Sequence, residues 1–392
     1  MNICLYKGSF NYEVVNYFVD ELEDTLIRRG HNVCVVDLKK IRNDIEINQL
    51  IEYLKNQKIE LVVSYNGTGI LKSKIYEMLN IVFISILVDH PAYHYDRIID
   101  IKDKKHVITL HDEGAIKTAE KYIDSKKIYS HLMHGGSHAS KEYKEKIYDV
   151  VVLGGINKEN LCIEKDMKKI DDDFIESIGM KLYYEAKDDL VHTLDFHLEN
   201  VIKSMKIKEE ILNLKAFKQI LMYLYTIVDR TIRCELRFNH IKNLISNNIK
   251  VDYFGLCNID EFNDSKYFVN HGSVEYKEVL EVMAKSKILI HDMCYFKNGS
   301  HERVFSAMLN GALVVSNRNN YSYNMYKDKE SIVYYDTGNF NDLVSTVKYY
   351  LKNDEERNQI VTKAYNITSK YNTWENRAEG ILELYDIVNN MK

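Results

Sequence analysis

Two spacings of hydrophobic residues alternate along the first half of the chain. Short apolar runs rich in Val and Ile are followed by stretches in which apolar residues recur at helical spacing. Continuous apolar runs of this length are typical of strands buried on both faces, so the alternation predicts parallel strands covered by helices. The expected strands are residues 2–6, 33–38, 59–64, 81–88, 106–110 and 127–132. The expected helices are residues 14–27, 47–56 and 71–79.

The same alternation returns in the second half after a long stretch without strand patterns. Within that stretch, amphipathic patterns over 174–205 and 207–245 predict helices only. The expected strands of this half are residues 148–153, 251–254, 288–291, 312–316 and 332–335. The expected helices are residues 273–284 and 301–310 and a helical tail from residue 341.

We therefore expect an α/β protein with two Rossmann-like, doubly wound domains. The first domain is expected at 1–146 and the second at 147–371, with a helical insertion at about 158–245. The final helix, about 372–392, is a candidate to pack back on the first domain. In sheets of this kind, ligands bind at the carboxyl ends of the strands, so the residues that follow each strand are the candidate functional residues.

The composition narrows the class of protein without naming a partner. Of 392 residues, 45% are hydrophobic and 28% are charged, which excludes a disordered chain. The formal net charge of -5 gives no support to nucleic-acid binding. No apolar run is long enough to span a bilayer, and the first residues lack a signal-peptide pattern. Because the six cysteines are also scattered, a cytoplasmic protein with reduced thiols is expected.

The segment 298–316 carries the clearest candidate chemistry. A glycine-bearing loop opens a helix here, and the first turn of that helix holds polar and charged residues. The backbone N–H groups and the dipole at a helix start suit an anion, and Arg303 adds a planar cation suited to phosphate. Glu302 and Ser306 are candidates to hold ribose hydroxyls. A plain helix start with a Ser cap is the alternative.

This segment resembles the donor-binding motif of the group 1 glycosyltransferases with the GT-B fold, in their spore-maturation, CgeB-like branch. The run 298–316 is similar to the stretch S-x-R-x-x-E-A-M-A-x-G-A-x-V of that branch. Residues 371–377 are similar to the y-s-W-e-x-r motif near the end of such chains. The resemblance covers about 148–385, interrupted by the insertion, and only general GT-B features are found before it.

The resemblance implies two domains that face a cleft and a nucleotide-diphosphate sugar, most often a UDP-sugar, as donor. It implies that Arg303 meets the diphosphate. The other residues expected around the donor are Gly299, Ser300, His301, Glu302, Ser306, Gly255, Gly154, Gly155, Asn319 and Tyr321. In relatives a glutamate at the position of Ser306 contacts the ribose, and Glu302, one turn earlier, is a candidate to replace it. Each glycine can instead serve only a turn with positive φ.

A polar loop follows the wholly apolar strand 81–88. Asp89 and His90 stand at the end of this strand, and Pro91 restricts the backbone of His90. The resemblance implies a histidine here that contacts the transferred sugar. We therefore expect His90 to contact the sugar or to act as a general base, with Asp89 orienting it. A loop histidine satisfied by the backbone is the alternative.

Polar residues also follow the other strands of the first domain. The candidates for the acceptor and sugar side are Gly8, Ser9, His94, His111 and His134. Each of these histidines can equally be structural. A metal cluster of His90, His94, His111 and His134 is not favoured, because among these four only His90 and His94 are four positions apart and Pro91 lies between them. The resemblance implies a metal-independent reaction. The glycines of 66–69 and 154–155 match neither a P-loop nor a dinucleotide-binding fingerprint.

The resemblance and the residues together predict a glycosyltransferase that moves a sugar from a nucleotide-diphosphate sugar to a hydroxyl of a glycan or protein. Bacterial cell-surface glycans and protein glycosylation both fit. Two alternatives stay open, a nucleotide-sugar 2-epimerase of the same fold and a non-catalytic nucleotide-sugar-binding partner. Peripheral membrane association and a homo-oligomer formed through the helical insertion also stay open.

Overall fold

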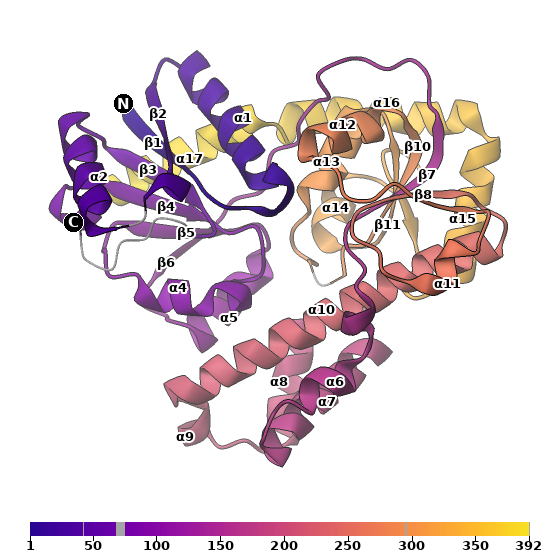
Figure 1. The fold of residues 1–392 in the computed structure, drawn as a ribbon, viewed down its shortest axis with the longest axis horizontal. Helices are drawn as coiled ribbons and strands as arrows, with labels where there is room; N and C mark the ends of the chain where they lie inside the picture. Colours follow the sequence, from indigo (N-terminus) through magenta and orange to yellow (C-terminus); the bar gives the residue numbers. More distant parts are fainter. Residues whose placement is uncertain (42, 68–74, 295, 392) are drawn as a thin grey trace. The chain divides into compact units, whose positions relative to one another are not determined.

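The computed structural model describes residues 1–41, 43–67, 75–294 and 296–391, and the chain forms two compact units. Unit 1 comprises Met1–Gly135 and Asn372–Lys392, and unit 2 comprises Gly136–Tyr371. Each unit is built on one six-stranded parallel sheet with helices packed against it (Figure 1). The prediction of two doubly wound α/β halves is confirmed. None of the described helices is long and apolar enough to cross a membrane.

The sheet of unit 1 has the strand order β2-β1-β3-β4-β5-β6. Its strands are β1 (Asn2–Lys7), β2 (Asn32–Asp37), β3 (Leu61–Tyr65), β4 (Val82–Ile86), β5 (His106–Leu110) and β6 (Ile128–His131). Its helices include α1 (Val14–Arg28), α2 (Asp44–Asn56), α3 (Ile75–Met78), α4 (Tyr95–Asp100) and α5 (Glu113–Tyr122). Every strand predicted for this half is present. Of the predicted helix 71–79, residues 71–74 lie outside the described residues, as do residues 68 and 69 of the segment 66–69.

The C-terminal helix α17 (Trp374–Asn389) completes unit 1. It begins with a capping box formed by Thr373 and Asn376, and it packs against α1 and β4. The rings of Trp374 and Phe18 lie 5.2 Å apart. Nε of Arg377 donates to the backbone oxygen of His134 at 2.8 Å across 243 residues of sequence. The end of the chain therefore covers a sheet built from its beginning.

The sheet of unit 2 has the strand order β12-β11-β10-β7-β8-β9. Its strands are β7 (Tyr148–Leu153), β8 (Val251–Phe254), β9 (Phe268–Asn270), β10 (Ser286–His291), β11 (Leu313–Asn317) and β12 (Val333–Tyr335). The helices outside the insertion are α11 (Asp260–Asn263), α12 (Tyr276–Ala284), α13 (Glu302–Leu309), α14 (Asn320–Met325), α15 (Phe340–Lys352) and α16 (Asp354–Tyr371). The sequence did not predict β9, because a strand of three residues has too short a pattern to register.

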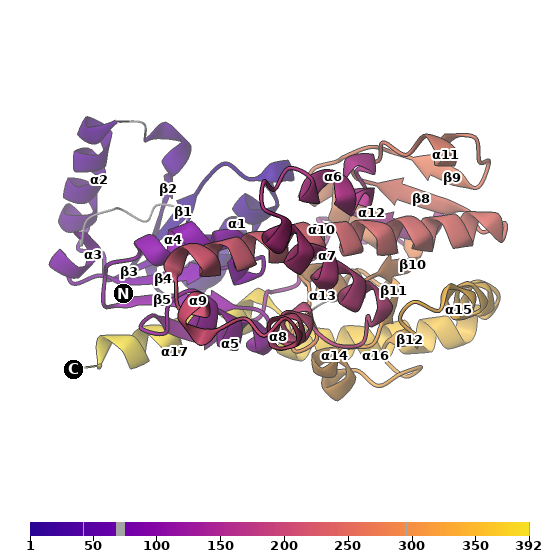
Figure 2. The same cartoon turned by 90° about the horizontal axis from the view of Figure 1, so that it is seen from below.

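The helical insertion lies between β7 and β8. It contains η4 (Lys158–Leu161), α6 (Ile163–Met167), α7 (Asp173–Asp188), α8 (Leu194–Ser204), α9 (Glu209–Leu212) and α10 (Lys215–Ser246). The helical pattern predicted over 174–205 corresponds to two helices, α7 and α8. Oδ1 of Asp189 accepts the N–H of Val191 at 2.9 Å, and Thr193 caps α8 through the N–H of Phe196 at 3.1 Å, so a turn separates α7 from α8. Figure 2 shows α10, which contains 32 residues, running beside α7.

A buried histidine makes the stability of unit 1 depend on pH. His106 on β5 is hydrogen-bonded through Nε2 to the hydroxyl of Ser85 at 2.7 Å, and burial lowers its pKa to about 3. A histidine whose pKa is lower in the folded state than in the unfolded state stabilises the fold fully above pH 6.5 and loses that contribution as the pH falls toward the folded pKa.

As the pH falls from 6 to 4, we expect the free energy of unfolding to decrease less steeply in the His106→Gln variant than in the wild type. The expected difference in slope is up to about 1.4 kcal/mol per pH unit. Urea unfolding at pH 7, 6, 5 and 4 measures this difference in slope. Equal slopes for the two proteins would show that His106 is not the group that titrates on unfolding.

Candidate active site

The second sheet reverses its direction of winding at β7, and the candidate site lies at the carboxyl end of that strand. β7 pairs with β8 on one side and with β10 on the other. The crevice at such a switch point is where doubly wound sheets bind their ligands. The residues that follow these three strands are Gly154 and Gly155, Gly255, and Asp292.

Two of the predicted glycines, Gly154 and Gly255, allow the turns after β7 and β8 to approach each other closely. Gly154 and Gly255 have φ values of +129° and +146°. A Cβ on Gly255 would lie 1.8 Å from the carbonyl oxygen of Gly154. Gly155 differs, because a Cβ there would meet nothing within 4 Å. Gly154 and Gly255 are therefore required by the backbone, whereas Gly155 borders open space.

Two arginines from different helices donate hydrogen bonds to the backbone around the turn after β7. Nη1 of Arg303, in the first turn of α13, donates to the backbone oxygen of Leu153 at 3.2 Å. Nη1 of Arg237, on α10, donates to the backbone oxygen of Gly155 at 2.7 Å. Arg303 was predicted from the sequence and Arg237 was not. The structure brings the two guanidinium groups to one short segment of backbone.

A buried carboxylate fixes Arg237 from the other side. Nη2 of Arg237 lies 3.3 Å from Oδ2 of Asp292, which follows β10. Burial alone would raise the pKa of Asp292, but Arg237 and other cationic neighbours lower it below its usual range, so the carboxylate is ionised. Burial lowers the pKa of Arg303, yet a guanidinium starts high enough to stay charged at neutral pH. The site thus contains two cations with fixed orientations.

The start of α13 adds polar groups beside these cations. His301 is the N-cap, and its Nδ1 accepts the N–H of Arg303 at 3.3 Å. Ser300 is fully buried and His291 is 5% exposed. Among the described residues, the Ser300 hydroxyl and Nε2 of His291 have no hydrogen-bond partner. Since buried polar atoms normally have a partner, these two are candidates to bind a ligand.

Glu302 and Ser306 are both turned into unit 2. The Glu302 carboxylate lies against the ring of His301, and Oε1 is 3.9 Å from Nε of Arg303. The Ser306 hydroxyl accepts the N–H of Ser137 at 3.1 Å and lies 3.0 Å from the hydroxyl of Tyr276. Ser306 is fully buried, so its surroundings fit a small side chain. The larger glutamate that the resembled family has at this position would not fit there.

We expect Ser306→Glu to destabilise the protein by about 1–3 kcal/mol, because the larger side chain overpacks a filled interior. Thermal unfolding measures this, with Ser306→Ala as the control that removes the hydrogen bonds without adding volume. A Ser306→Glu variant as stable as Ser306→Ala would show that the space exists after all.

The loop after β11 is hydrogen-bonded to the loop that precedes α13. Nδ2 of Asn319 donates to the backbone oxygens of Phe296 and Gly299, at 3.1 Å each, and its Oδ1 accepts the N–H of Ser322 at 2.6 Å. The side chain of Asn319 therefore fixes the loop that carries Gly299. The Tyr321 hydroxyl is 3.8 Å from the sulfur of Met325, on the same helix.

In unit 1 the structure places His90 at the start of a short helix. The helix η3 (Pro91–His94) begins after it, and Nδ1 of His90 accepts the N–H of Ala92 at 3.2 Å. In a neutral imidazole with an accepting Nδ1, the proton is on Nε2. The observed arrangement suits donation of a hydrogen bond by Nε2 and does not suit proton abstraction. Burial lowers the pKa of both His94 and His111 to about 4, although the nearby Asp89 carboxylate raises it in part.

The remaining candidates of unit 1 are divided between the interior and the surface. The rings of His111 and His134 lie 4.9 Å apart, and His134 stacks on Phe18 at 6.2 Å. Both histidines are buried, which favours their structural interpretation. The backbone of Gly8 is held on both sides by Asn16, at 3.1 and 2.9 Å, while Ser9 is exposed.

Arg237 and Asp292 are the residues that sequence reasoning missed. Arg237 lies 66 positions before Arg303, inside a helix whose apolar stripe indicated only packing. One signal was available, because Arg230, Arg233 and Arg237 recur at helical spacing and so lie on one face of α10. The contact with Gly155 could not be read from that spacing.

Comparisons with known proteins agree with this architecture. Residues 234–383 match the sequence pattern of a family described as glycosyl transferase-like. The structure superimposes on HepE of Anabaena in complex with UDP and glucose over 99% of this chain and 100% of that one, with 9% identity and a TM-score of 0.57. Sucrose-phosphate synthase of Thermosynechococcus elongatus matches over 99% of both chains, with 9% identity and a TM-score of 0.55. The protein has the GT-B fold.

Other GT-B structures extend the likeness. A DNA-modifying β-glucosyltransferase matches over 100% of both chains, with 12% identity and a TM-score of 0.53. A search among curated proteins gives no match.

Proposed function

We propose that this GT-B protein transfers a sugar from a UDP-sugar, and that unit 2 binds the donor. The observation that carries the proposal is the convergence of Arg237 and Arg303 on the turn after β7, at 2.7 and 3.2 Å from the backbone oxygens of Gly155 and Leu153. A diphosphate is the group that two guanidinium groups and a helix start suit best. The solved structures of HepE with UDP and with UDP-glucose support uridine as the nucleoside of the donor.

The same arrangement supports a mechanism. When the glycosidic bond to the nucleotide breaks, negative charge accumulates on the departing diphosphate. Arg303 and Arg237 are already oriented by backbone oxygens and by Asp292, so they stabilise this charge without rearranging. Preorganised charges of this kind lower the barrier because they stabilise the transition state more than they stabilise the donor in its ground state.

For the acceptor we propose the carboxyl edge of the first sheet. His90 stands there, and its Nε2 is suited to donate a hydrogen bond to a sugar oxygen. A hydroxyl of a glycan or protein is the proposed acceptor, and the motif at 298–316 supports the CgeB-like branch.

Titration calorimetry with UDP, ADP and GDP tests the donor. We expect UDP to bind more tightly than the other two, and we expect Arg237→Gln to weaken UDP about tenfold or more, as for loss of one charge-assisted hydrogen bond. Release of UDP from a panel of UDP-sugars then identifies the donor. Absence of binding for all three diphosphates would contradict the proposal.

A further inference from the structure

A row of arginines extends away from the proposed diphosphate site along α10. Arg230, Arg233 and Arg237 are spaced by three and four residues and share one face of the helix. With Gly155 and Asn160 they line a pocket of about 190 Å³, to which Cys234 also contributes. Gly155 lies in the turn after β7 and Arg237 donates to its backbone oxygen, so the pocket adjoins that turn.

Each arginine of the row is held by its own carboxylate. Arg230 pairs with Asp166 at 3.2 Å, Arg233 with Asp229 at 2.6 Å and Arg237 with Asp292 at 3.3 Å. In every pair the carboxylate is the less exposed side chain, with 16% against 42%, 10% against 30% and 7% against 13%. The acids thus lie beneath the guanidinium groups and fix their orientation.

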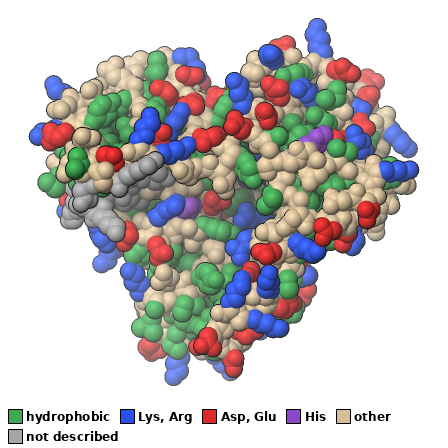
Figure 3. Space-filling model, viewed as in Figure 1, with side chains coloured by type: hydrophobic (Ala, Val, Ile, Leu, Met, Phe, Trp, Pro, Cys, Tyr) green, Lys and Arg blue, Asp and Glu red, His purple; other side chains and the backbone are tan. Residues whose placement is uncertain are grey.

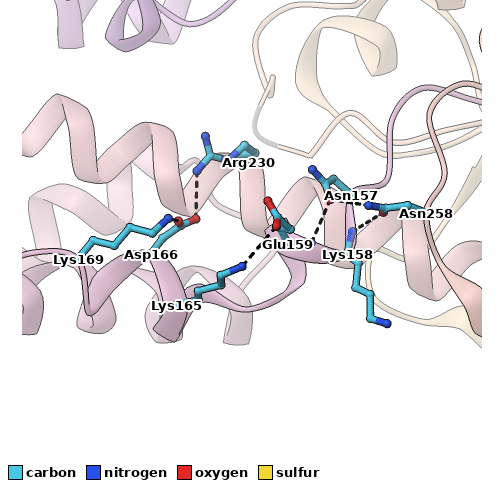
Figure 4. Close-up of polar contacts among 8 residues, drawn as sticks. All are labelled: Asn157, Lys158, Glu159, Lys165, Asp166, Lys169, Arg230 and Asn258. Carbon is cyan, nitrogen blue, oxygen red and sulfur yellow. Dashed lines mark hydrogen bonds and ion pairs between the residues drawn. The ribbon is translucent and has the colours of Figure 1, made fainter.

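The lining of the pocket itself contains no acid among the described residues. Figure 4 shows the acids close by already engaged, since Asp166 also pairs with Lys169 at 2.7 Å and Glu159 with Lys165 at 3.4 Å. Nε of Arg230 is buried and has no hydrogen-bond partner among the described residues. In the face drawn in Figure 3, Lys and Arg side chains gather over the part of the insertion that contains α6 and α10.

The loop that precedes Asn160 is held by hydrogen bonds of two asparagine side chains. Oδ1 of Asn157 accepts the N–H of Glu159 at 3.1 Å and the side-chain amide of Asn258 at 2.9 Å. Oδ1 of Asn258 in turn accepts the N–H of Lys158 at 2.7 Å, as Figure 4 shows. Asn160 follows this segment and lines the pocket, and its side-chain amide can donate a hydrogen bond to an anion.

We infer that the saccharide handled by this protein carries an acidic group, a carboxylate or a phosphate, which the pocket of Arg230, Arg233 and Arg237 binds. The inference rests on the proposed function, because it assigns the diphosphate to the inner end of the row. From Arg237 to Arg230 the helix rises about 10 Å, enough to reach past one sugar ring. Planar guanidinium groups pair with carboxylate and phosphate through two parallel hydrogen bonds, which neutral sugars cannot accept in that way.

Calorimetry on the full chain tests this in two arms. The donor arm compares UDP-glucuronic acid with UDP-glucose. The acceptor arm titrates glucuronic acid, glucose 6-phosphate and glucose into protein saturated with UDP. We expect the acidic compound to bind about tenfold or more tightly than its neutral counterpart in one arm, and that arm identifies whether donor or acceptor carries the acid.

Arg230→Gln is the decisive variant, and Lys169→Gln is its matched control. Asp166 pairs with both Arg230 and Lys169, so each variant removes one of its two cationic partners and keeps the other. Only Arg230 lines the pocket. We expect Arg230→Gln to abolish the preference for the acidic compound, with UDP affinity unchanged, and Lys169→Gln to keep it. Wild-type protein that binds UDP but prefers no acidic compound in either arm overturns this inference alone, as does equal loss in both variants. Wild-type protein that binds no UDP overturns the proposed function and the inference with it.

Discussion

Replacing Gly255 with Ala is expected to destabilise the protein by more than about 4 kcal/mol, a large part of the stability of a typical domain. Gly255 has φ of +146°, which side chains with a Cβ rarely adopt and which alone costs about 1–3 kcal/mol. The added Cβ would also lie 1.8 Å from the carbonyl oxygen of Gly154. Because that atom belongs to the backbone, the two turns after β7 and β8 must separate.

Thermal and urea unfolding of the variant measure this loss, and the neighbouring glycine supplies the control. Gly155→Ala places its Cβ where nothing lies within 4 Å, so we expect a change in stability within about 0.5 kcal/mol. If the two variants unfold alike, close approach of the two turns does not control the stability of the second unit.

The second large effect is expected on activity. Arg303→Ala should reduce the rate of sugar transfer by about two to three orders of magnitude, as for loss of one preorganised electrostatic partner of a transition state. The guanidinium group is held at 3.2 Å from the backbone oxygen of Leu153, so its position does not depend on the donor. Steady-state release of UDP from the best UDP-sugar measures the effect.

A second arginine serves as the control for removal of charge. Arg318 lies on the surface of the same unit, with 57% of its side chain exposed and Asp328 as an ion-pair partner at 3.7 Å. We expect Arg318→Ala to retain nearly full activity. An Arg303→Ala variant that is folded and retains nearly full activity would remove Arg303 from the proposed mechanism.

The sequence by itself determined the architecture. Buried parallel strands require continuous apolar runs, and these runs are visible without knowledge of what covers them. The strands of both sheets were therefore predicted, apart from the short strand β9, and the insertion was recognised as helical. The candidate donor-site residues 299–303 were proposed for a related reason, since a loop, a helix start and Arg303 are neighbours in sequence.

Only the tertiary structure decided which distant side chains share the site. The contact of Arg237 with Gly155 joins residues 82 positions apart, and helical spacing on α10 does not say what that face meets. In the same way, the burial of Ser306 against Ser137 and Tyr276 explains why a small residue stands where the resembled family has a glutamate. Local patterns fix secondary structure because neighbouring residues cause it, whereas a site depends on long-range packing, which local patterns do not record.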